Sequence, residues 1–494
     1  MPEFIIDPLK KISVIKPEIY GHFIEHLGRC IYDGLWVGSI SSIPNTCGFR
    51  NDIISFLKKI KIPVIRWPGG CFADTYHWQD GIGPVKQRPR RVNIHWGECI
   101  ETNEVGTHEF INLCNLTGAK PYICGNLGSG TVKELKDWVE YCNFSGDSSL
   151  AILRKNNGAV EPFKVKYWGI GNENWGCGGN FSPEDYCSEY KRYASFIRGF
   201  GSEIFLIACG PSSNDTEWTL RFFHKLKKDY WDFHNIHGFA IHYYCGTSGT
   251  ATEYTKDQWY SLIANGLFME DIIINHRQVM DNYDPNRRIG LVVDEWGAWH
   301  PSEPEESILF QQNTIRDAIV AATTLDIFNR NADKVVMTNI AQTVNVLQSL
   351  ILTKGEKMLI TPTGHVYEMY KNHQNSTSVK VFIESETVTF KDNEKERNIP
   401  AISGSASLKD KNLFITITNC HADKSFELSI KILGGINIKN CSGRILSSQE
   451  LNAKNTFERP DYVFPKDLTL NPERSNIKFS IPPASIVAIE AELI

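Results

Sequence analysis

Short apolar runs recur along the first three quarters of the chain, and each ends in Gly, polar or charged residues. A run of this length that is apolar throughout is typical of a strand buried on both faces. The pattern predicts eight such strands, within residues 18–25, 62–70, 120–126, 165–174, 205–210, 238–244, 289–297 and 334–342.

The segments between these runs have helical spacing. Apolar residues at 53, 56, 57 and 60, and again at 132, 135, 139 and 142, would share one helical face. Ser182 followed by Pro183 is a typical helix start, with an N-cap serine and proline at the first helical position. Eight strand and helix units favour a closed (β/α)8 TIM barrel over an open doubly wound sheet, and working residues then lie at the carboxyl ends of the strands.

The pattern changes after about residue 374. Phe426, Leu428, Ile430 and Ile432 alternate with polar residues, and turn-forming residues separate such runs. We expect the barrel to span 16–375 and an all-β sandwich to span 376–494, the sandwich being completed by a strand from residues 1–15.

Composition narrows the class of protein. The 494 residues are 41% hydrophobic and 22% charged, which is ordinary globular usage, and a net charge of −5 without a basic run gives no reason to expect a nucleic-acid partner. No apolar stretch approaches the roughly 18 residues of a membrane span, and the first residues lack a signal-peptide core, so we expect a soluble, cytoplasmic protein without a membrane partner. The thirteen cysteines form no C-x-x-C pair, which argues against a structural zinc site.

Two short motifs have alternative interpretations. His22, Glu25 and His26 spell the H-x-x-E-H pattern of a zinc peptidase, but that pattern needs a helix, and the flanking Gly21 and Gly28 favour an extended segment. Residues 123–135 place three glycines between a strand and a helix, as in a phosphate-binding loop, yet the spacing is wrong and the loop lysine is missing. We therefore expect a strand and a tight barrel loop.

The strand ends carry a more coherent set of polar residues. Asn172 and Glu173 follow the fourth strand, and Glu295 lies at the end of the seventh. These strands lie on opposite sides of a barrel mouth, so the two carboxylates can face each other across a substrate. Such a pair suits hydrolysis of a glycosidic bond.

The segments GHFIEHLG, RWPGGCFADTYHWQDGIGP, ETNEVGTHEF, GNEN and DEWG closely resemble those of the α-L-arabinofuranosidases of glycoside hydrolase family 51. The resemblance runs from about residue 19 to 374. It implies Glu173 as the acid/base, Glu295 as the nucleophile, and Asn172 as a ligand of the sugar 2-hydroxyl. Glu25 would then bind arabinose hydroxyls rather than zinc.

The resemblance also implies further substrate-binding residues. Arg66 is expected beside the nucleophile, Tyr244 as its hydrogen-bond donor, and Gln342 or Asn345 as a ligand of the exocyclic hydroxyl. Trp96 and Trp299 resemble aromatic walls of the aglycone side, and packing beneath loops is the alternative for both.

The activity that follows is a retaining, exo-acting α-L-arabinofuranosidase acting on arabinan- or arabinoxylan-derived oligosaccharides, with no metal or organic cofactor. A β-xylosidase, an endo-β-glycanase and a non-catalytic sugar-binding protein are the alternatives. Family resemblance further implies a homo-oligomer, a hexamer.

One position departs from the family. Many members have Asn after the PGG of the second strand, where it contacts the sugar, whereas this chain has Cys71, and Cys177 follows four residues after Glu173. We expect both sulfurs beside the arabinose subsite, either as a disulfide that braces two catalytic loops or as two reduced thiols.

Overall fold

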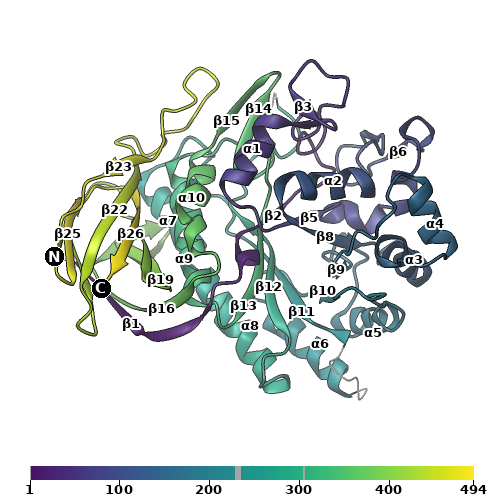
Figure 1. Ribbon diagram of the computed structural model, residues 1–494. Coiled ribbons are helices and arrows are strands. Elements are labelled where there is room, and N and C mark those ends of the chain that lie inside the picture. The colour runs from purple at the N-terminus through teal and green to yellow at the C-terminus, as the bar shows by residue number, and fades with distance from the viewer. Residues whose placement is uncertain (1, 229–234, 304–305) are drawn as a thin grey trace.

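The computed structural model describes residues 2–228, 235–303 and 306–494, and in these residues eight parallel strands close into a barrel beside a ten-stranded sheet. Figure 1 shows the barrel on the right and the sheet on the left, with both chain termini in the sheet. The described residues contain no helix that is long and apolar enough to cross a membrane.

The barrel strands follow one another around the barrel in chain order, and all eight lie within the runs expected from the sequence. Their order is β2 (Gly21–Phe23), β5 (Val64–Trp67), β8 (Lys120–Gly125), β9 (Tyr167–Ile170), β10 (Phe205–Ala208), β11 (Gly238–Tyr244), β12 (Gly290–Gly297) and β13 (Val335–Ile340). The TIM-barrel prediction is thereby confirmed.

Helices connect the strands. Ser182 accepts a hydrogen bond from the backbone N–H of Asp185 and so caps α5, as its sequence predicts. The connecting helices are α1 (Asn51–Lys59), α2 (Thr107–Thr117), α3 (Val132–Asn143), α4 (Ser149–Asn156), α5 (Pro183–Ala194), α6 (Thr216–Lys228), α7 (Lys256–Leu267), α8 (Met269–Tyr283) and α9 (Ile315–Arg330). A hairpin of β14 (Ile351–Lys354) and β15 (Lys357–Ile360), then α10 (Pro362–Tyr370), follow the last barrel strand.

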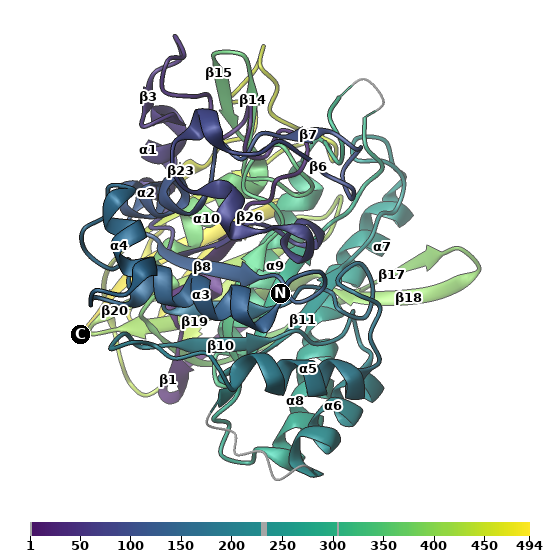
Figure 2. The same ribbon diagram turned by 90° about the vertical axis from the view of Figure 1, so that its right-hand side faces the viewer.

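The remaining chain is rich in strands that form one continuously hydrogen-bonded sheet. The N-terminal strand β1 (Glu3–Val14) lies inside this sheet, antiparallel to β16 and parallel to β21. The other strands of the sheet are β16 (Thr377–Glu384), β19 (Ile402–Lys409), β20 (Asn412–Asn419), β21 (Phe426–Ile432), β22 (Ile438–Ser447), β23 (Lys466–Leu468), β24 (Pro472–Glu473), β25 (Asn476–Ile481) and β26 (Ser485–Leu493). A separate hairpin of β17 (Thr387–Asp392) and β18 (Lys395–Pro400) projects from the body in Figure 2.

The barrel and the sheet pack directly on each other through α9. Asp326 of this helix is buried and accepts hydrogen bonds from Ser405 of β19 and Thr416 of β20, at 2.7 and 2.6 Å. The hydroxyl of Tyr370 in α10 donates a third, at 3.1 Å. A polar cluster thus connects the two parts of the chain within an otherwise apolar contact.

Candidate active site

The carboxyl ends of the barrel strands surround one cavity, and most of the residues expected at a sugar site line it. Glu25 follows β2, Glu173 follows β9, Tyr244 ends β11, and Glu295 lies in β12. The complete lining is Glu25, Gly70, Cys71, Trp96, Glu173, Tyr244, Glu295, Trp299, Leu309, Gln342 and Leu347.

Gly70 shows how closely the cavity wall fits. A Cβ atom at this position would lie 2.9 Å from Glu295 Oε1 and 3.4 Å from Glu25 Oε2. A side chain there would displace at least one of these carboxylates, so the PGG segment lets the backbone approach both of them.

Glu295 is buried, and both of its oxygens have donors. Arg66 Nη1 lies 2.7 Å from Oε1, and the Tyr244 hydroxyl lies 2.8 Å from Oε2. Burial alone would raise the pKa of Glu295, but the positive charges of His242 and Arg66 and the hydrogen bonds from Arg66 and Tyr244 hold it below its usual value. Burial and the same carboxylate raise the pKa of Tyr244, which therefore stays a donor.

Arg66 connects three groups beneath the cavity. Besides Glu295, its guanidinium donates to Asn172 Oδ1 at 2.5 Å, and its Nε lies 3.2 Å from Asp294. Although burial opposes the charge of Arg66, Asp294 and Glu295 raise its pKa well above the usual range. The side chain thus fixes Asn172 and Glu295 relative to each other.

Glu173 lies opposite Glu295. Its Oε1 is 3.0 Å from Nδ1 of His242, and that nitrogen is also 3.5 Å from Glu295 Oε2. One carboxylate oxygen each of Glu173 and Glu295 and a ring nitrogen of His242 all lie within 4.8 Å of one another. The backbone of Glu173 is in the left-handed region, with φ of 41°, a conformation that costs energy for a residue with a side chain and is common at functional sites.

Glu25 is held by three donors. The backbone N–H of Phe72 and Nε1 of Trp96 donate to Oε1 at 3.0 and 2.9 Å, and Nε2 of Gln342 donates to Oε2 at 3.0 Å. Burial and the charge of Glu295 nevertheless raise the pKa of Glu25 to about 7. A buried carboxyl group with polar neighbours is well suited to bind sugar hydroxyls.

The H-x-x-E-H residues point to different places. His22 lies in β2, is fully buried and packs on the Tyr367 ring with centroids 4.8 Å apart. Nδ1 of His26 lies 2.9 Å from Glu101, and its Nε2 accepts from Trp67. The segment is extended as expected, but the strand β2 ends at Phe23, so Glu25 and His26 lie just after it, and the three side chains do not converge on one point.

The glycine-rich loop after β8 is closed on itself. The N–H groups of Leu127 and Gly128 both donate to Asp74 at 2.7 Å, and those of Ser129 and Gly130 donate to Asn126. Its amides are therefore already used, as expected for a tight barrel loop rather than a phosphate site.

The structure distinguishes between the two amides considered for the eighth strand. Gln342 lines the cavity, whereas Asn345 donates to the Arg29 carbonyl and to Thr353 outside it. Trp96 and Trp299 are half-buried in the wall, and the Trp299 ring meets that of Tyr244 edge to face at 4.9 Å. Both tryptophans thus lie at the cavity rather than only beneath loops.

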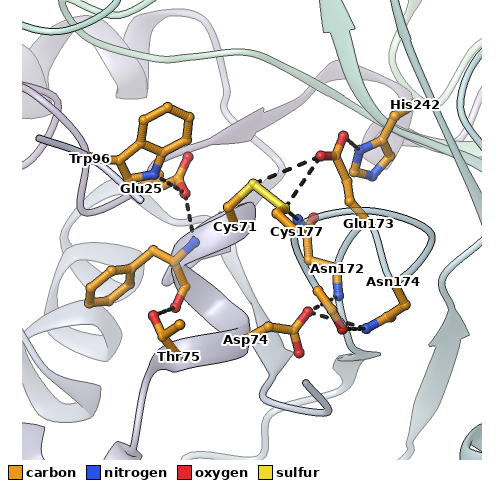
Figure 3. The surroundings of a disulfide bond; sticks show 12 residues. Glu25, Cys71, Asp74, Thr75, Trp96, Asn172, Glu173, Asn174, Cys177 and His242 are labelled. Carbon is orange, nitrogen blue, oxygen red and sulfur yellow. Dashed lines mark hydrogen bonds and ion pairs between the residues drawn. A yellow bond between two sulfur atoms is a disulfide. The ribbon is translucent and has the colours of Figure 1, made fainter. Parts of the chain in front are cut away.

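Cys71 and Cys177 form a disulfide, with Cα atoms 5.6 Å apart (Figure 3). The adjoining loop is tied down by buried Asp74, which accepts from the N–H of Asn172 at 2.7 Å in addition to the two loop amides. Burial raises the pKa of Asp74 to about 7, although the hydrogen bonds from these backbone N–H groups act to lower it. The two loops that carry Cys71 and Glu173 are therefore joined both covalently and through Asp74.

Sequence reasoning missed His242 and Asp294. His242 lies two residues before Tyr244 in β11, and residues two apart on a strand share a face, so this signal was available. Asp294 precedes Glu295, and neighbouring strand residues normally face opposite ways, but the pairing of β12 with β13 is irregular between Val293 and Trp296. Asp294 also accepts from Tyr122 and Asn339, at 2.7 and 2.8 Å.

Two groups among the described residues have the donor types and spacing of a metal site, although the first would need its disulfide reduced before the sulfurs could bind an ion. One is Cys71, Glu173 and Cys177, and the other is Glu173, His242 and Glu295. Both groups contain Glu173, so an ion bound at either one would occupy one of the two facing carboxylates, Glu173 and Glu295.

Comparison with known proteins agrees with this geometry. The family model described as "Alpha-L-arabinofuranosidase 1 domain" matches residues 56–258, and "Alpha-L-arabinofuranosidase C-terminal domain" matches residues 294–485. A Bacteroides ovatus protein named "Intracellular exo-alpha-L-arabinofuranosidase" is 45% identical over 492 residues, which cover 97% of this chain and 93% of that protein.

Solved structures agree as well. The family 51 arabinofuranosidase from Xanthomonas axonopodis pv. citri superposes with a TM-score of 0.94, at 38% identity and 99% coverage of both chains. The α-L-arabinofuranosidase from Thermotoga maritima, solved as an arabinose complex, superposes with a TM-score of 0.89, at 32% identity and with complete coverage of both chains. The chain belongs to the α-L-arabinofuranosidases of glycoside hydrolase family 51.

Proposed function

We propose that the protein is a retaining, exo-acting α-L-arabinofuranosidase in which Glu295 is the nucleophile and Glu173 the acid/base. The observation that carries the proposal is the carboxylate pair itself, with an oxygen of each residue within 4.8 Å of the other at the mouth of the barrel. Retaining glycosidases hold their carboxyl groups about 5–5.5 Å apart, whereas inverting enzymes leave about 6.5–9.5 Å for a water molecule.

In the first step, Glu295 attacks the anomeric carbon while Glu173 gives its proton to the glycosidic oxygen. The attacking group must be ionised, and Arg66 and Tyr244 favour this through their hydrogen bonds at 2.7 and 2.8 Å. The bond to the leaving sugar breaks, and an arabinosyl ester of Glu295 forms. Asn172, oriented by Arg66, would bind the sugar 2-hydroxyl as positive charge develops on the ring.

In the second step, Glu173, now a carboxylate, takes a proton from water as the water attacks the anomeric carbon. The ester bond breaks and Glu295 leaves as a carboxylate. Two inversions at one carbon give net retention of configuration. Glu173 is again protonated and Glu295 again ionised, so each residue returns to its starting protonation state.

Substrate binding is assigned to the rest of the cavity wall. Glu25, Gln342 and Cys71 would contact the terminal arabinose, and Trp96 and Trp299 would face the leaving sugar. The name of the Bacteroides ovatus relative, an intracellular exo-acting enzyme, supports exo action and an intracellular location, which fits oligosaccharides from arabinan or arabinoxylan better than intact polymers. We further infer a homo-oligomer, a hexamer, which light scattering on the purified protein would test.

Initial rates on aryl α-L-arabinofuranoside and aryl β-xyloside test the assignment. We expect a clear preference for the arabinofuranoside, and loss of turnover in Glu295→Ala. A tenfold preference for the xyloside would replace the proposal with a β-xylosidase. Absence of activity on every glycoside would leave a sugar-binding protein instead.

A further inference from the structure

The disulfide lies at the wall of the candidate active site. Cys71 follows β5 and lines the cavity, and Cys177 belongs to the loop after β9 that carries Glu173. Both residues are half-buried, so solvent reaches this pair. Buried thiols on the helices around the barrel differ, because burial raises the pKa of Cys114 in α2 and Cys142 in α3 and keeps them protonated and unreactive.

Both sulfur atoms adjoin the same carboxylate oxygen. Glu173 Oε2 lies 3.6 Å from Cys177 Sγ and 3.9 Å from Cys71 Sγ (Figure 3). The other oxygen, Oε1, is bound to His242, which fixes the plane of the carboxylate. A disulfide carries no proton and no charge, so in the oxidised state the sulfurs offer Oε2 only weak acceptors.

Reduction changes this chemistry. A dithiol reductant gives the disulfide two electrons and two protons, the S–S bond breaks, and two thiols and the oxidised reductant result. In the disulfide form the two sulfurs and one Glu173 oxygen already lie within 4.8 Å of one another, and reduction turns the sulfurs into possible metal ligands. A tetrahedral zinc site, with Zn–S distances of about 2.3 Å and Zn–O distances of about 2.0–2.2 Å, needs ligand atoms roughly 3.5–3.8 Å apart. Glu173 Oε2, at 3.6 and 3.9 Å from the two sulfurs, is already near that separation, and the sulfurs move apart to it once the bond between them is broken.

We propose that reduced Cys71 and Cys177 bind a thiophilic divalent cation of the Zn²⁺ type together with Glu173 Oε2. Thiolate sulfur selects such ions over Mg²⁺ or Ca²⁺, and binding releases the two thiol protons. His242 orients the ligating carboxylate through its second oxygen, as hydrogen-bonded partners of metal ligands commonly do. Three protein ligands leave the fourth position open toward the cavity.

Occupancy of this site inhibits turnover, a consequence that rests on the proposed function. An ion on Oε2 removes the oxygen that would carry the proton for the leaving group and blocks the space beside the sugar. The oxidised enzyme is insensitive because a disulfide is a poor metal ligand. The chain therefore combines a redox-sensitive pair with a metal-dependent block of its acid/base.

Two measurements on the full chain test the proposal, each on oxidised and dithiol-reduced protein. The first is the thiolate-to-metal absorption of added Co²⁺, which reports sulfur ligation without reference to activity. The second is the ratio of aryl arabinofuranosidase rates with and without one equivalent of Zn²⁺. Cys47→Ser/Cys99→Ser, which removes two exposed cysteines, is the matched control.

We expect the Co²⁺ band in reduced protein and in the control, but not in oxidised protein or in Cys71→Ser/Cys177→Ser. Zn²⁺ should lower the rate at least tenfold where the band forms and less than twofold elsewhere, with recovery on adding a chelator. If the double variant does not fold, Cys177→Ser alone, which leaves one thiol, should weaken the band and the inhibition.

Several results would overturn the proposal. No band in reduced protein would remove the site, and a band without inhibition would remove its effect on catalysis. Equal inhibition in Cys71→Ser/Cys177→Ser would assign the ion to Glu173, His242 and Glu295. A band in a protein that cleaves no arabinofuranoside would retain the metal site and reject the proposed function instead.

Discussion

Replacing Tyr244 by phenylalanine removes one hydrogen bond from the proposed nucleophile and little else. The hydroxyl lies 2.8 Å from Glu295 Oε2, and the ring, which packs edge to face on Trp299, is retained. A hydrogen bond to an ionised group contributes about 1.5–3 kcal/mol, which corresponds to about a 10- to 150-fold change in rate. We expect kcat/KM of Tyr244→Phe to fall within that range.

The pH dependence of kcat/KM gives a second, independent test of the Tyr244 hydrogen bond. The Tyr244 hydrogen bond helps hold the pKa of Glu295 below its usual value, so its loss raises that pKa, and the acid limb of kcat/KM should move to higher pH. The assay is the pH profile on an aryl α-L-arabinofuranoside. Tyr243→Phe is the matched control, because the hydroxyl of Tyr243 donates to the Asn265 carbonyl and makes no contact with Glu295.

An unmoved acid limb with a less than threefold fall in kcat/KM would refute this account of Glu295. The control variant should retain the profile of the unaltered enzyme. If both variants shifted alike, the effect would come from β11 as a whole rather than from the hydrogen bond.

Three further predictions concern the acid/base, the domains and the barrel–sheet contact. In Glu173→Ala, activity on substrates with poor leaving groups should fall about 10²- to 10⁴-fold, while on an activated aryl substrate azide should restore turnover and give an arabinosyl azide of retained configuration; an inverted azide would reassign the two carboxylates. We propose that residues 16–375 and residues 376–494 with 1–15 are the two structural units, so limited proteolysis that frees the tail while 1–15 stays with the barrel would contradict this division. Burial raises the pKa of Asp326 to about 7 in the folded protein, whereas in the unfolded chain this carboxyl group titrates near pH 4. Between these values only the folded protein keeps the proton, so its stability should fall as the pH rises from about 4 to about 7. Asp326→Asn should flatten that decline in the thermal midpoint, and an unchanged slope would show that Asp326 is not its source.

The parts of the fold that depend on local pattern were predictable. Eight apolar runs gave the barrel strands, and the Ser182-Pro183 pair gave the start of α5. The hairpins β14–β15 and β17–β18 were not predicted as separate units, because hairpin pairing depends on turn geometry and on what each strand packs against.

In the candidate site, too, some residues could be located from local sequence and others could not. Glu173 and Glu295 could be located at strand ends from the sequence, since a barrel brings all carboxyl ends to one face. The contact of Asp294 with Arg66 could not be predicted from the sequence, because it depends on an irregular register in β12. Only the folded loops distinguish Gln342 from Asn345, which lie three residues apart but face the cavity and the Arg29 carbonyl respectively.

The covalent intermediate is the central claim, and trapping it is the most direct test. In Glu173→Ala, an activated aryl α-L-arabinofuranoside should still arabinosylate the enzyme, while hydrolysis of the ester is slow because no base activates water. Peptide mass spectrometry after a rapid acid quench should find one anhydro-arabinose unit on the peptide containing Glu295, and fragmentation should locate it on that side chain. A label on any other residue, or release of product with inverted configuration and no labelled peptide, would contradict the mechanism.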